Sequence, residues 1–194
     1  MTSVYFVRHA QPDSSIRDDK SRPLTDEGVK DSLMVTEVLS DKQIDIIFSS
    51  PYKRSMDTVA DFSKKSGLVI NTIDDLRERN AGMWHGENFF EFIKNQWEDF
   101  SYHILDGECL FDVQKRNIKA LEKILDENKN KNIVIATHGT ALSTILNYYY
   151  PQFNAECFFK IVDFMPFVIK VDFDEKRAVN AGVELVIKKT FKRK

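Results

Sequence analysis

The chain has 194 residues, of which 42% are hydrophobic and 30% are charged. That length and composition are typical of one globular domain and argue against a disordered chain, so residues 1–194 are expected to form a single domain. The formal net charge of -2 gives no overall field that would attract nucleic acid or an anionic membrane, and neither partner is expected. Two cysteines, Cys109 and Cys157, are too few for a disulfide scaffold and lack metal-ligand spacing. No apolar run has the length of a signal peptide or a membrane span, so we expect a cytoplasmic protein.

Strands and helices are predicted to alternate along most of the chain. Runs of β-branched and aromatic residues indicate short buried strands, and apolar residues at helical spacing indicate helices between them. In chain order, the predicted elements are strand 4–7, helix 25–39, strand 44–48, helix 51–65, strand 68–73, helix 89–100, helix 113–125, strand 133–136, helix 140–149, and a hairpin of strands 167–173 and 183–188. This order predicts an α/β fold: a three-layer α/β/α sandwich whose sheet is mostly parallel, with an antiparallel edge.

Local signals refine the first two helices. Thr25 is suited to cap the first helix, and Val29 and Leu33 lie close to helical spacing, which predicts that both belong to its apolar face. At the start of the second helix, Ser50 can act as the cap and Pro51 can occupy the first turn.

Two histidines follow predicted strands at the point where each strand ends. Arg8 and His9 come directly after the first strand, where a guanidinium can hold an anion while the imidazole reaches the central atom of that anion. His138 lies between strand 133–136 and a helix start, whose free N–H groups favour negative charge. In open α/β sheets, ligands bind outside the carboxyl ends of the strands. The alternative for each histidine is a purely structural role beside a strand-end ion pair.

Several segments resemble those of the histidine phosphatase superfamily, the phosphoglycerate-mutase-like proteins. Val-Arg-His-Ala at 7–10 and Thr-His-Gly at 137–139 resemble its two histidine motifs in order and separation. Ser-Ser-Pro-Tyr-Lys-Arg-Ser-Met-Asp-Thr at 49–58 resembles the segment that carries a second phosphate-binding arginine, here Arg54. Leu-Arg-Glu at 76–78, followed by Gly82, Trp84 and Gly86, resembles the acid-base segment, and Pro-Leu-Thr at 23–25 and Gly107-Glu108 resemble further landmarks. The resemblance implies a phosphoglycerate-mutase-like fold.

The resemblance also implies a mechanism without metal or cofactor. His9 would attack phosphorus and become a phosphohistidine, while Arg8 and Arg54 neutralise the phosphate oxygens. His138 would donate a hydrogen bond as charge redistributes, and Glu78 would protonate the leaving oxygen and then activate water. Taken alone, Arg54 would be interpreted first as a helix-surface cation and Glu78 as a solvated charge, and the resemblance reverses that order.

Other residues near these motifs have open alternatives. Ser15, where the family often has asparagine, and Glu108 are predicted to bind substrate, although Glu108 could also be a first-turn helix charge. His85 could approach substrate or be an exposed loop residue. Ala10 stands where a glycine is common and adds a methyl group near the phosphate, and Cys109 is predicted to be a small buried thiol without a catalytic role.

These features predict a phosphatase that hydrolyses small phosphomonoesters, with a small phosphorylated metabolite as its partner. A phosphoglycerate mutase or an α-ribazole-phosphatase-like enzyme is the alternative within the same chemistry. An alternative of another class is a non-catalytic phospholigand sensor, because a fold alone does not establish activity. The basic C-terminal end is predicted to be a solvated tail; its charged residues are Lys188, Lys189, Lys192, Arg193 and Lys194. The oligomeric state is left open.

Overall fold

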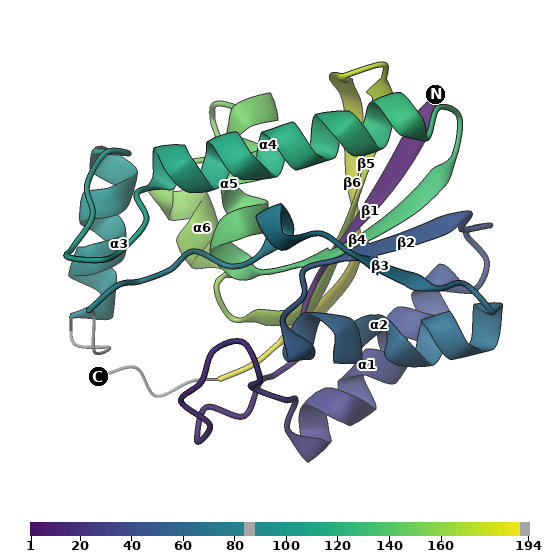
Figure 1. Ribbon diagram of the computed structural model, residues 1–194, viewed down its shortest axis with the longest axis horizontal. Coiled ribbons are helices and arrows are strands. Elements are labelled where there is room, and N and C mark those ends of the chain that lie inside the picture. Colours follow the sequence, from purple (N-terminus) through teal and green to yellow (C-terminus); the bar gives the residue numbers. More distant parts are fainter. Residues whose placement is uncertain (84–87, 191–194) are drawn as a thin grey trace.

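A six-stranded sheet lies between two layers of helices in the computed structural model, which describes residues 1–83 and 88–190 (Figure 1). The strands are β1 (Thr2–Arg8), β2 (Ile46–Ser49), β3 (Ile70–Thr72), β4 (Asn132–Thr137), β5 (Phe164–Asp174) and β6 (Arg177–Lys188). The helices are α1 (Asp26–Leu39), α2 (Lys53–Ser66), α3 (Phe89–Glu98), α4 (Leu110–Glu127), α5 (Gly139–Tyr149) and α6 (Ala155–Ile161), with a short 3-10 helix η1 (Asp74–Leu76). The predicted α/β/α sandwich is confirmed.

The strand order is β3-β2-β4-β1-β5-β6. Strands β3, β2, β4 and β1 are parallel, whereas β5 runs antiparallel to β1 and pairs with β6 as a hairpin. The predicted parallel sheet with an antiparallel edge is therefore confirmed. In the central pair, Arg8 of β1 lies opposite Thr137 of β4, so the two strands end at the same level. The residues that follow them, His9 and His138, are brought together by this register.

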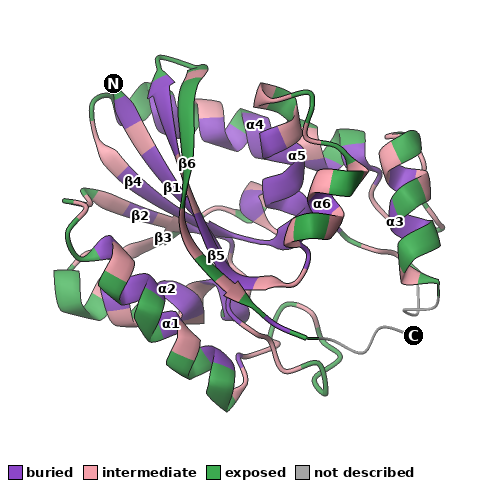
Figure 2. Cartoon of the chain, turned by 180° about the vertical axis from the view of Figure 1, so that it is seen from behind, coloured by how far each residue is buried: buried purple, intermediate pink, exposed green. Residues whose placement is uncertain are grey.

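Alternating side chains of the central strands build one apolar core on each face of the sheet. Val4 and Phe6 of β1 are fully buried beneath α4 and α5, whereas Tyr5 and Val7 of the same strand pack toward α1 and α2. Successive side chains of a strand point to opposite faces, which explains this division. Figure 2 shows the result: the central strands are buried along most of their length, and the outer surfaces of the helices are exposed. No helix in the described ranges is long and apolar enough to cross a bilayer.

The first helix is capped as predicted but buries a different face. The Thr25 hydroxyl accepts a hydrogen bond from the backbone N–H of Gly28 at 2.9 Å. The prediction for Val29 and Leu33 was wrong, because both are exposed and smaller residues such as Gly28 and Ser32 face inward. A Cβ atom at Gly28 would stand 2.3 Å from the carbonyl oxygen of Gln11, so the helix approaches the loop after β1 more closely than a larger residue allows.

Two other predictions were wrong in detail, and one helix was not predicted. Helix α2 begins at Lys53, after Tyr52, so Ser50 and Pro51 precede it. The two-turn helix α6 was not predicted, because seven residues are too few to show a helical period. Lys189 is not solvated: its side chain is 9% exposed, and its ammonium lies 2.5 Å from carboxylate oxygens of Glu27 and Asp31 on α1. Residues 192–194 lie outside the described part of the chain.

Candidate active site

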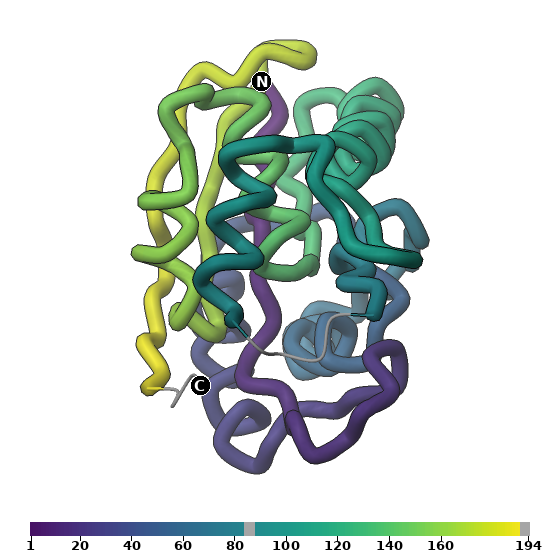
Figure 3. The backbone as a smooth tube through the Cα atoms, turned by 90° about the vertical axis from the view of Figure 1, so that its left-hand side faces the viewer, coloured from purple at the N-terminus to yellow at the C-terminus, as the bar shows by residue number. Residues whose placement is uncertain are grey.

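The carboxyl ends of β1 and β4 place two buried imidazoles side by side. His9 is 5% exposed and His138 is fully buried. Their ring centroids are 5.2 Å apart, with the ring planes inclined at 63°. The backbone N–H of His9 donates to the carbonyl of Thr137 at 3.1 Å, which continues the β1–β4 pairing into the site. Figure 3 looks toward this end of the sheet and shows α3 and the loop after β1 flanking it.

The surroundings of His9 select the form that can act as a nucleophile. Its Nδ1 lies 2.8 Å from the carbonyl oxygen of Ala10, which can only accept, so Nδ1 carries the proton and Nε2 keeps a lone pair. Burial lowers the pKa of His9 well below its usual value, and the positive charges of Arg54 and Arg8 lower it further. A neutral imidazole with a free Nε2 is competent for nucleophilic attack on phosphorus.

His138 is held by Ser50, which the sequence analysis assigned to the cap of the second helix. Its Nε2 lies 2.8 Å from the hydroxyl of Ser50, at the end of β2. Its Nδ1 is buried and has no hydrogen-bond partner among the described residues. Burial, followed by the charge of Arg54, lowers the pKa of His138 well below its usual value. Ser50 therefore belongs to the site, and its position after a strand at the same sheet edge was the signal that could have shown this.

The Arg8 guanidinium lies between β1 and the start of α5. It is 7% exposed and donates from Nη1 to the carbonyl of Ile161 at 2.9 Å. Gly139, the first residue of α5, packs against it: a Cβ there would stand 3.0 Å from Cζ of Arg8. The glycine of the Thr-His-Gly segment therefore provides room for a cation beside the two histidines.

Arg54 enters the same site from the first turn of α2. Its side chain is only 4% exposed, and its Cζ lies 5.1 Å from the centroid of the Tyr52 ring. The Tyr52 ring in turn lies 5.1 Å from that of His138. Nη1 of Arg54 is 3.1 Å from a carboxylate oxygen of Asp19, which lies in the loop after β1. A buried arginine of this kind is a ready ligand for an anion.

Glu78 binds the amino-terminal end of α5. Its two carboxylate oxygens accept hydrogen bonds from the backbone N–H groups of Thr140 and Ala141, each at 3.1 Å, and one of them also accepts from the N–H of Arg79 at 2.8 Å. Because α5 begins directly after His138, this contact brings the predicted acid-base residue beside the second histidine. The free N–H groups of a helix start favour a negative charge there.

Two predicted substrate-binding residues have other contacts. The Glu108 carboxylate accepts hydrogen bonds from Arg116, Arg77 and the backbone N–H of Asn80. Burial raises the pKa of Glu108, but the Arg116 and Asn80 hydrogen bonds outweigh that effect and leave the pKa below its usual value. Ser15 is exposed and donates to the Asp13 carboxylate at 2.7 Å. Their roles in substrate binding stay predictions.

The remaining sequence expectations concern residues around the pocket. Ala10 is fully buried, and its N–H donates to the Thr58 hydroxyl at 2.9 Å. Cys109 is buried as predicted, with its thiol 3.3 Å from Asp112. Trp84, His85 and Gly86 lie outside the described residues. Sequence reasoning missed three residues around the site: Asp19, Ser50 and Arg116.

The comparisons with known proteins agree with this arrangement. The model of the histidine phosphatase superfamily (branch 1) matches residues 4–178. Phosphoglycerate mutase-like protein 4 of Arabidopsis thaliana is 31% identical over 157 residues, which cover 73% of this chain and 68% of that protein. Phosphoserine phosphatase 1 of Hydrogenobacter thermophilus is 27% identical over 150 residues, 71% of each chain.

A solved structure shows that the likeness extends to the whole fold. The phosphoserine phosphatase of Entamoeba histolytica, in complex with 3-phosphoglyceric acid, superposes with a TM-score of 0.79 at 20% identity and covers 96% of this chain and 98% of that one. The paired histidines at the ends of β1 and β4, together with the family match over most of the chain, lead to one conclusion: this protein belongs to the histidine phosphatase superfamily.

Proposed function

We propose that this protein is a metal-independent phosphatase that hydrolyses small phosphomonoesters through a phosphohistidine on His9. The observation that carries the proposal is the setting of His9: its Nδ1 lies 2.8 Å from the Ala10 carbonyl, which leaves Nε2 to attack, and burial lowers its pKa, which favours the neutral ring. The buried guanidinium groups of Arg8 and Arg54 supply the positive charge that a phosphoryl group requires.

In the first step, Nε2 of His9 attacks phosphorus in line with the ester oxygen. The N–P bond forms as the P–O bond breaks, and Glu78 gives its proton to the departing oxygen, which leaves as an alcohol. In the second step, Glu78 takes a proton from water, whose oxygen attacks phosphorus and breaks the N–P bond. Inorganic phosphate leaves, and His9 returns to its neutral form. Each step exchanges one bond at phosphorus for another, so no oxidant or reductant is required.

The other groups act on the charge of the phosphoryl oxygens. Arg8 and Arg54 neutralise these oxygens in the ground state and the transition state. His138 donates a hydrogen bond from Nδ1 to a phosphoryl oxygen when substrate is bound. The hydroxyl of Ser50 fixes the orientation of that ring from the other nitrogen. Removal of one such preorganised donor typically lowers kcat by about 10²–10³-fold.

We place the leaving group in a cavity beside Arg8. This cavity, of about 440 Å³, is lined by polar residues of the loop after β1 and by apolar residues of α3, β5 and the end of α6; the lining residues are Arg8, Gln11, Pro12, Asp13, Ser14, Thr25, Phe89, Val162 and Met165. A cavity of this size and mixed character suits a small metabolite. The named relatives act on phosphoserine or resemble phosphoglycerate mutase, and small phosphorylated acids of this kind are the substrates we propose.

The test is phosphate release from a generic aryl phosphate in excess chelator, with native protein and the His9→Ala variant. Native turnover that falls by several orders of magnitude in the variant supports the proposal. Equal turnover in the two proteins would contradict it. If neither protein releases phosphate but phosphoglycerate isomers interconvert, the protein is a mutase. Equilibrium binding of phosphate esters without any turnover would make it a phospholigand sensor.

A further inference from the structure

The loop between β1 and α1 places one carboxylate on the buried cation of α2. Nη1 of Arg54 donates to the backbone carbonyl of Asp19 at 2.5 Å and lies 3.1 Å from its Oδ1, and Nη2 donates to Oδ2 at 3.3 Å. Asp19 thus engages both terminal nitrogens of the guanidinium through its carboxylate and adds a backbone contact to one of them. No other described residue has a hydrogen bond to these two nitrogens.

Asp19 is itself held in place by its loop. Its Oδ1 accepts a hydrogen bond from Nη1 of Arg22 at 2.8 Å. The same arginine donates from Nε to the carbonyl of Ile16 at 2.8 Å and from Nη2 to that of Arg17 at 3.1 Å. Because Arg22 joins three points of the loop, the carboxylate presented to Arg54 has a defined position rather than being one of many conformers of a surface side chain.

This arrangement leaves one edge of the Arg54 guanidinium for a ligand. A guanidinium carries five N–H donors in a planar fork. Asp19 accepts one hydrogen bond from Nη1 through its carbonyl and one from Nη2 through Oδ2, with Oδ1 in ion-pair contact with Nη1; neither Nε–H nor the second Nη2–H bonds to a described residue. These two hydrogens are parallel donors, and a phosphate can accept both through two of its oxygens. Tyr52 connects this guanidinium to the paired histidines: Cζ of Arg54 lies 5.1 Å from the Tyr52 ring centroid, and that ring lies 5.1 Å from the ring of His138, which neighbours His9.

We propose that Asp19 is a positioning residue that holds Arg54 by the end of its guanidinium, so that the Nε edge is presented to the phosphate of the substrate. The inference rests on the proposed function, because it assumes that phosphate binds beside His9. It assigns to the loop a part in catalysis that is exerted through Arg54 and not through contact with substrate. A carboxylate on the far side of an arginine stabilises one rotamer of a long, flexible side chain.

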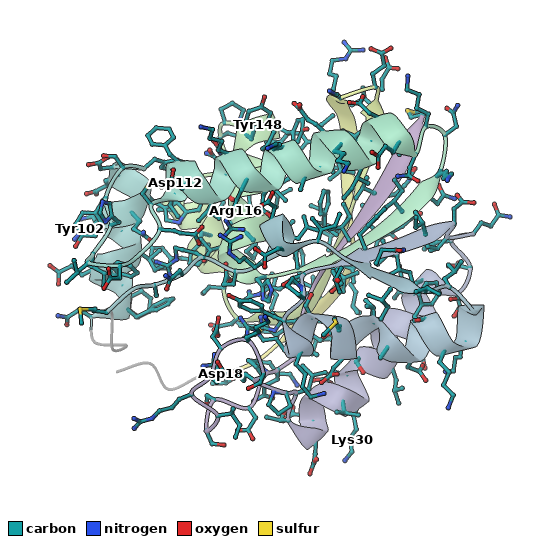
Figure 4. The ribbon with its side chains drawn as sticks, in the orientation of Figure 1. Asp18, Lys30, Tyr102, Asp112, Arg116 and Tyr148 are labelled. Carbon is teal, nitrogen blue, oxygen red and sulfur yellow. The ribbon has the colours of Figure 1, made fainter. Side chains whose placement is uncertain are left out.

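The test compares Asp19→Ala and Asp19→Asn with a matched control, Asp18→Asn. Asp18 is an exposed neighbour in the same loop, which Figure 4 labels, and its carboxylate accepts a hydrogen bond from the N–H of Ser21 at 2.9 Å. Three quantities are measured in full-length protein: kcat and KM for an aryl phosphate across pH, the dissociation constant of inorganic phosphate by calorimetry, and the thermal midpoint.

Asp19→Ala is expected to weaken phosphate binding and kcat/KM by about 10-fold or more, with a thermal midpoint within a few degrees of the native value. Asp19→Asn, which keeps an oxygen acceptor, should show a smaller loss, and Asp18→Asn should show none. The acid limb of kcat/KM should move to higher pH in Asp19→Ala, because a displaced Arg54 no longer lowers the pKa of His9. A simple loss of stability would not move that limb.

Unchanged phosphate affinity in Asp19→Ala would overturn the inference. Tighter binding would overturn it too, because it would show that the carboxylate competes with phosphate for Arg54. Should Asp19→Ala fail to fold, Asp19→Asn is compared with Asp18→Asn instead, and phosphate affinity equal in these two variants would overturn the inference. The calorimetric measurement of phosphate binding does not depend on turnover. An inactive native protein would contradict the proposed function, but this inference could still be tested.

Discussion

Gly139 lies against the guanidinium of Arg8, so that a Cβ atom at residue 139 would stand 3.0 Å from Cζ and from Nη2 of the arginine. A side chain at this position would therefore be closer to Arg8 than ordinary packing allows. The position is the start of α5, beside His138. The arginine is 7% exposed and cannot move aside without losing its hydrogen bond to the carbonyl of Ile161.

The first prediction therefore concerns Gly139→Ala. The added methyl group should displace the Arg8 guanidinium by a few tenths of an ångström and lower kcat/KM by about 10-fold, since small misplacements of a positioning group are costly in catalysis. Stability should change by less than about 1 kcal/mol, because alanine is the better helix former. Kinetics and urea unfolding of the same preparation measure both. An active variant with native kcat/KM would show that Arg8 adapts freely.

The second prediction concerns Ser50→Ala, which removes the hydroxyl beside Nε2 of His138. The imidazole loses its orienting partner and kcat should fall about 10-fold or more, with less effect on KM. Ser55→Ala is the matched control, because Ser55 is equally buried and pairs with the Ser49 hydroxyl at 3.1 Å instead of with a histidine. Equal losses in the two variants would mean that the effect is one of packing alone.

The third prediction concerns acid stability. The unfolded chain protonates His9 and His138 near pH 6.5, whereas burial and the neighbouring arginines lower the pKa of both in the folded protein. Below that pH the unfolded state binds more protons, so the free energy of unfolding should fall by about 1.4 kcal/mol per pH unit for each histidine until its folded pKa is reached. Urea unfolding at several pH values measures this slope. His138→Gln should make it shallower, and an unchanged slope would contradict the pKa assignment.

The fourth prediction separates the two roles considered for Glu108. The carboxylate is bound by Arg116, whose guanidinium also donates to the carbonyls of Asp75, Arg77 and Glu78. Figure 4 shows Arg116 on the side of α4 that faces this segment. Removing one partner of such a largely buried pair should cost about 3 kcal/mol. Glu108→Gln should therefore lower the unfolding free energy while KM stays close to native. A raised KM at native stability would support the substrate-binding role instead.

Lys123→Met is the control for this experiment. Lys123 lies on α4, as Arg116 does, and its ammonium is 3.9 Å from the Glu127 carboxylate. Both side chains are largely exposed, so loss of this ion pair should change stability by less than about 1 kcal/mol.

Most of the sheet was predictable because its strands are short apolar runs that end in turns. Strand β3 came out shorter than predicted, since only three residues of its run pair with β2. The inward face of α1 was not predictable: Val29 and Leu33 look like core residues, but the space beside Gln11 admits only Gly28. Periodicity records hydrophobicity and not the room available at a contact.

The residues of the site also differ in how far the sequence predicts them. His9 and His138 were recognisable because both follow strands, and the resemblance supplied Arg54 and Glu78. Ser50 could have been found from its position after a strand at the same sheet edge. Asp19 could not, because a half-exposed aspartate in a loop carries no distinguishing pattern and gains its significance only where that loop meets Arg54.

The pairing of β1 with β4 also has a kinetic consequence. Ser3 of β1 lies opposite Asn132 of β4, so the long segment between these residues must form a closed loop before His9 can meet His138. Contacts between distant parts of a chain are slow to form, because a long loop must first be closed at the expense of its entropy. The two imidazoles cannot approach one another in a folding intermediate that lacks the central strand pair. Recovery of enzyme turnover after dilution from denaturant should therefore follow the formation of the β1–β4 pair and lag behind the return of helical circular dichroism.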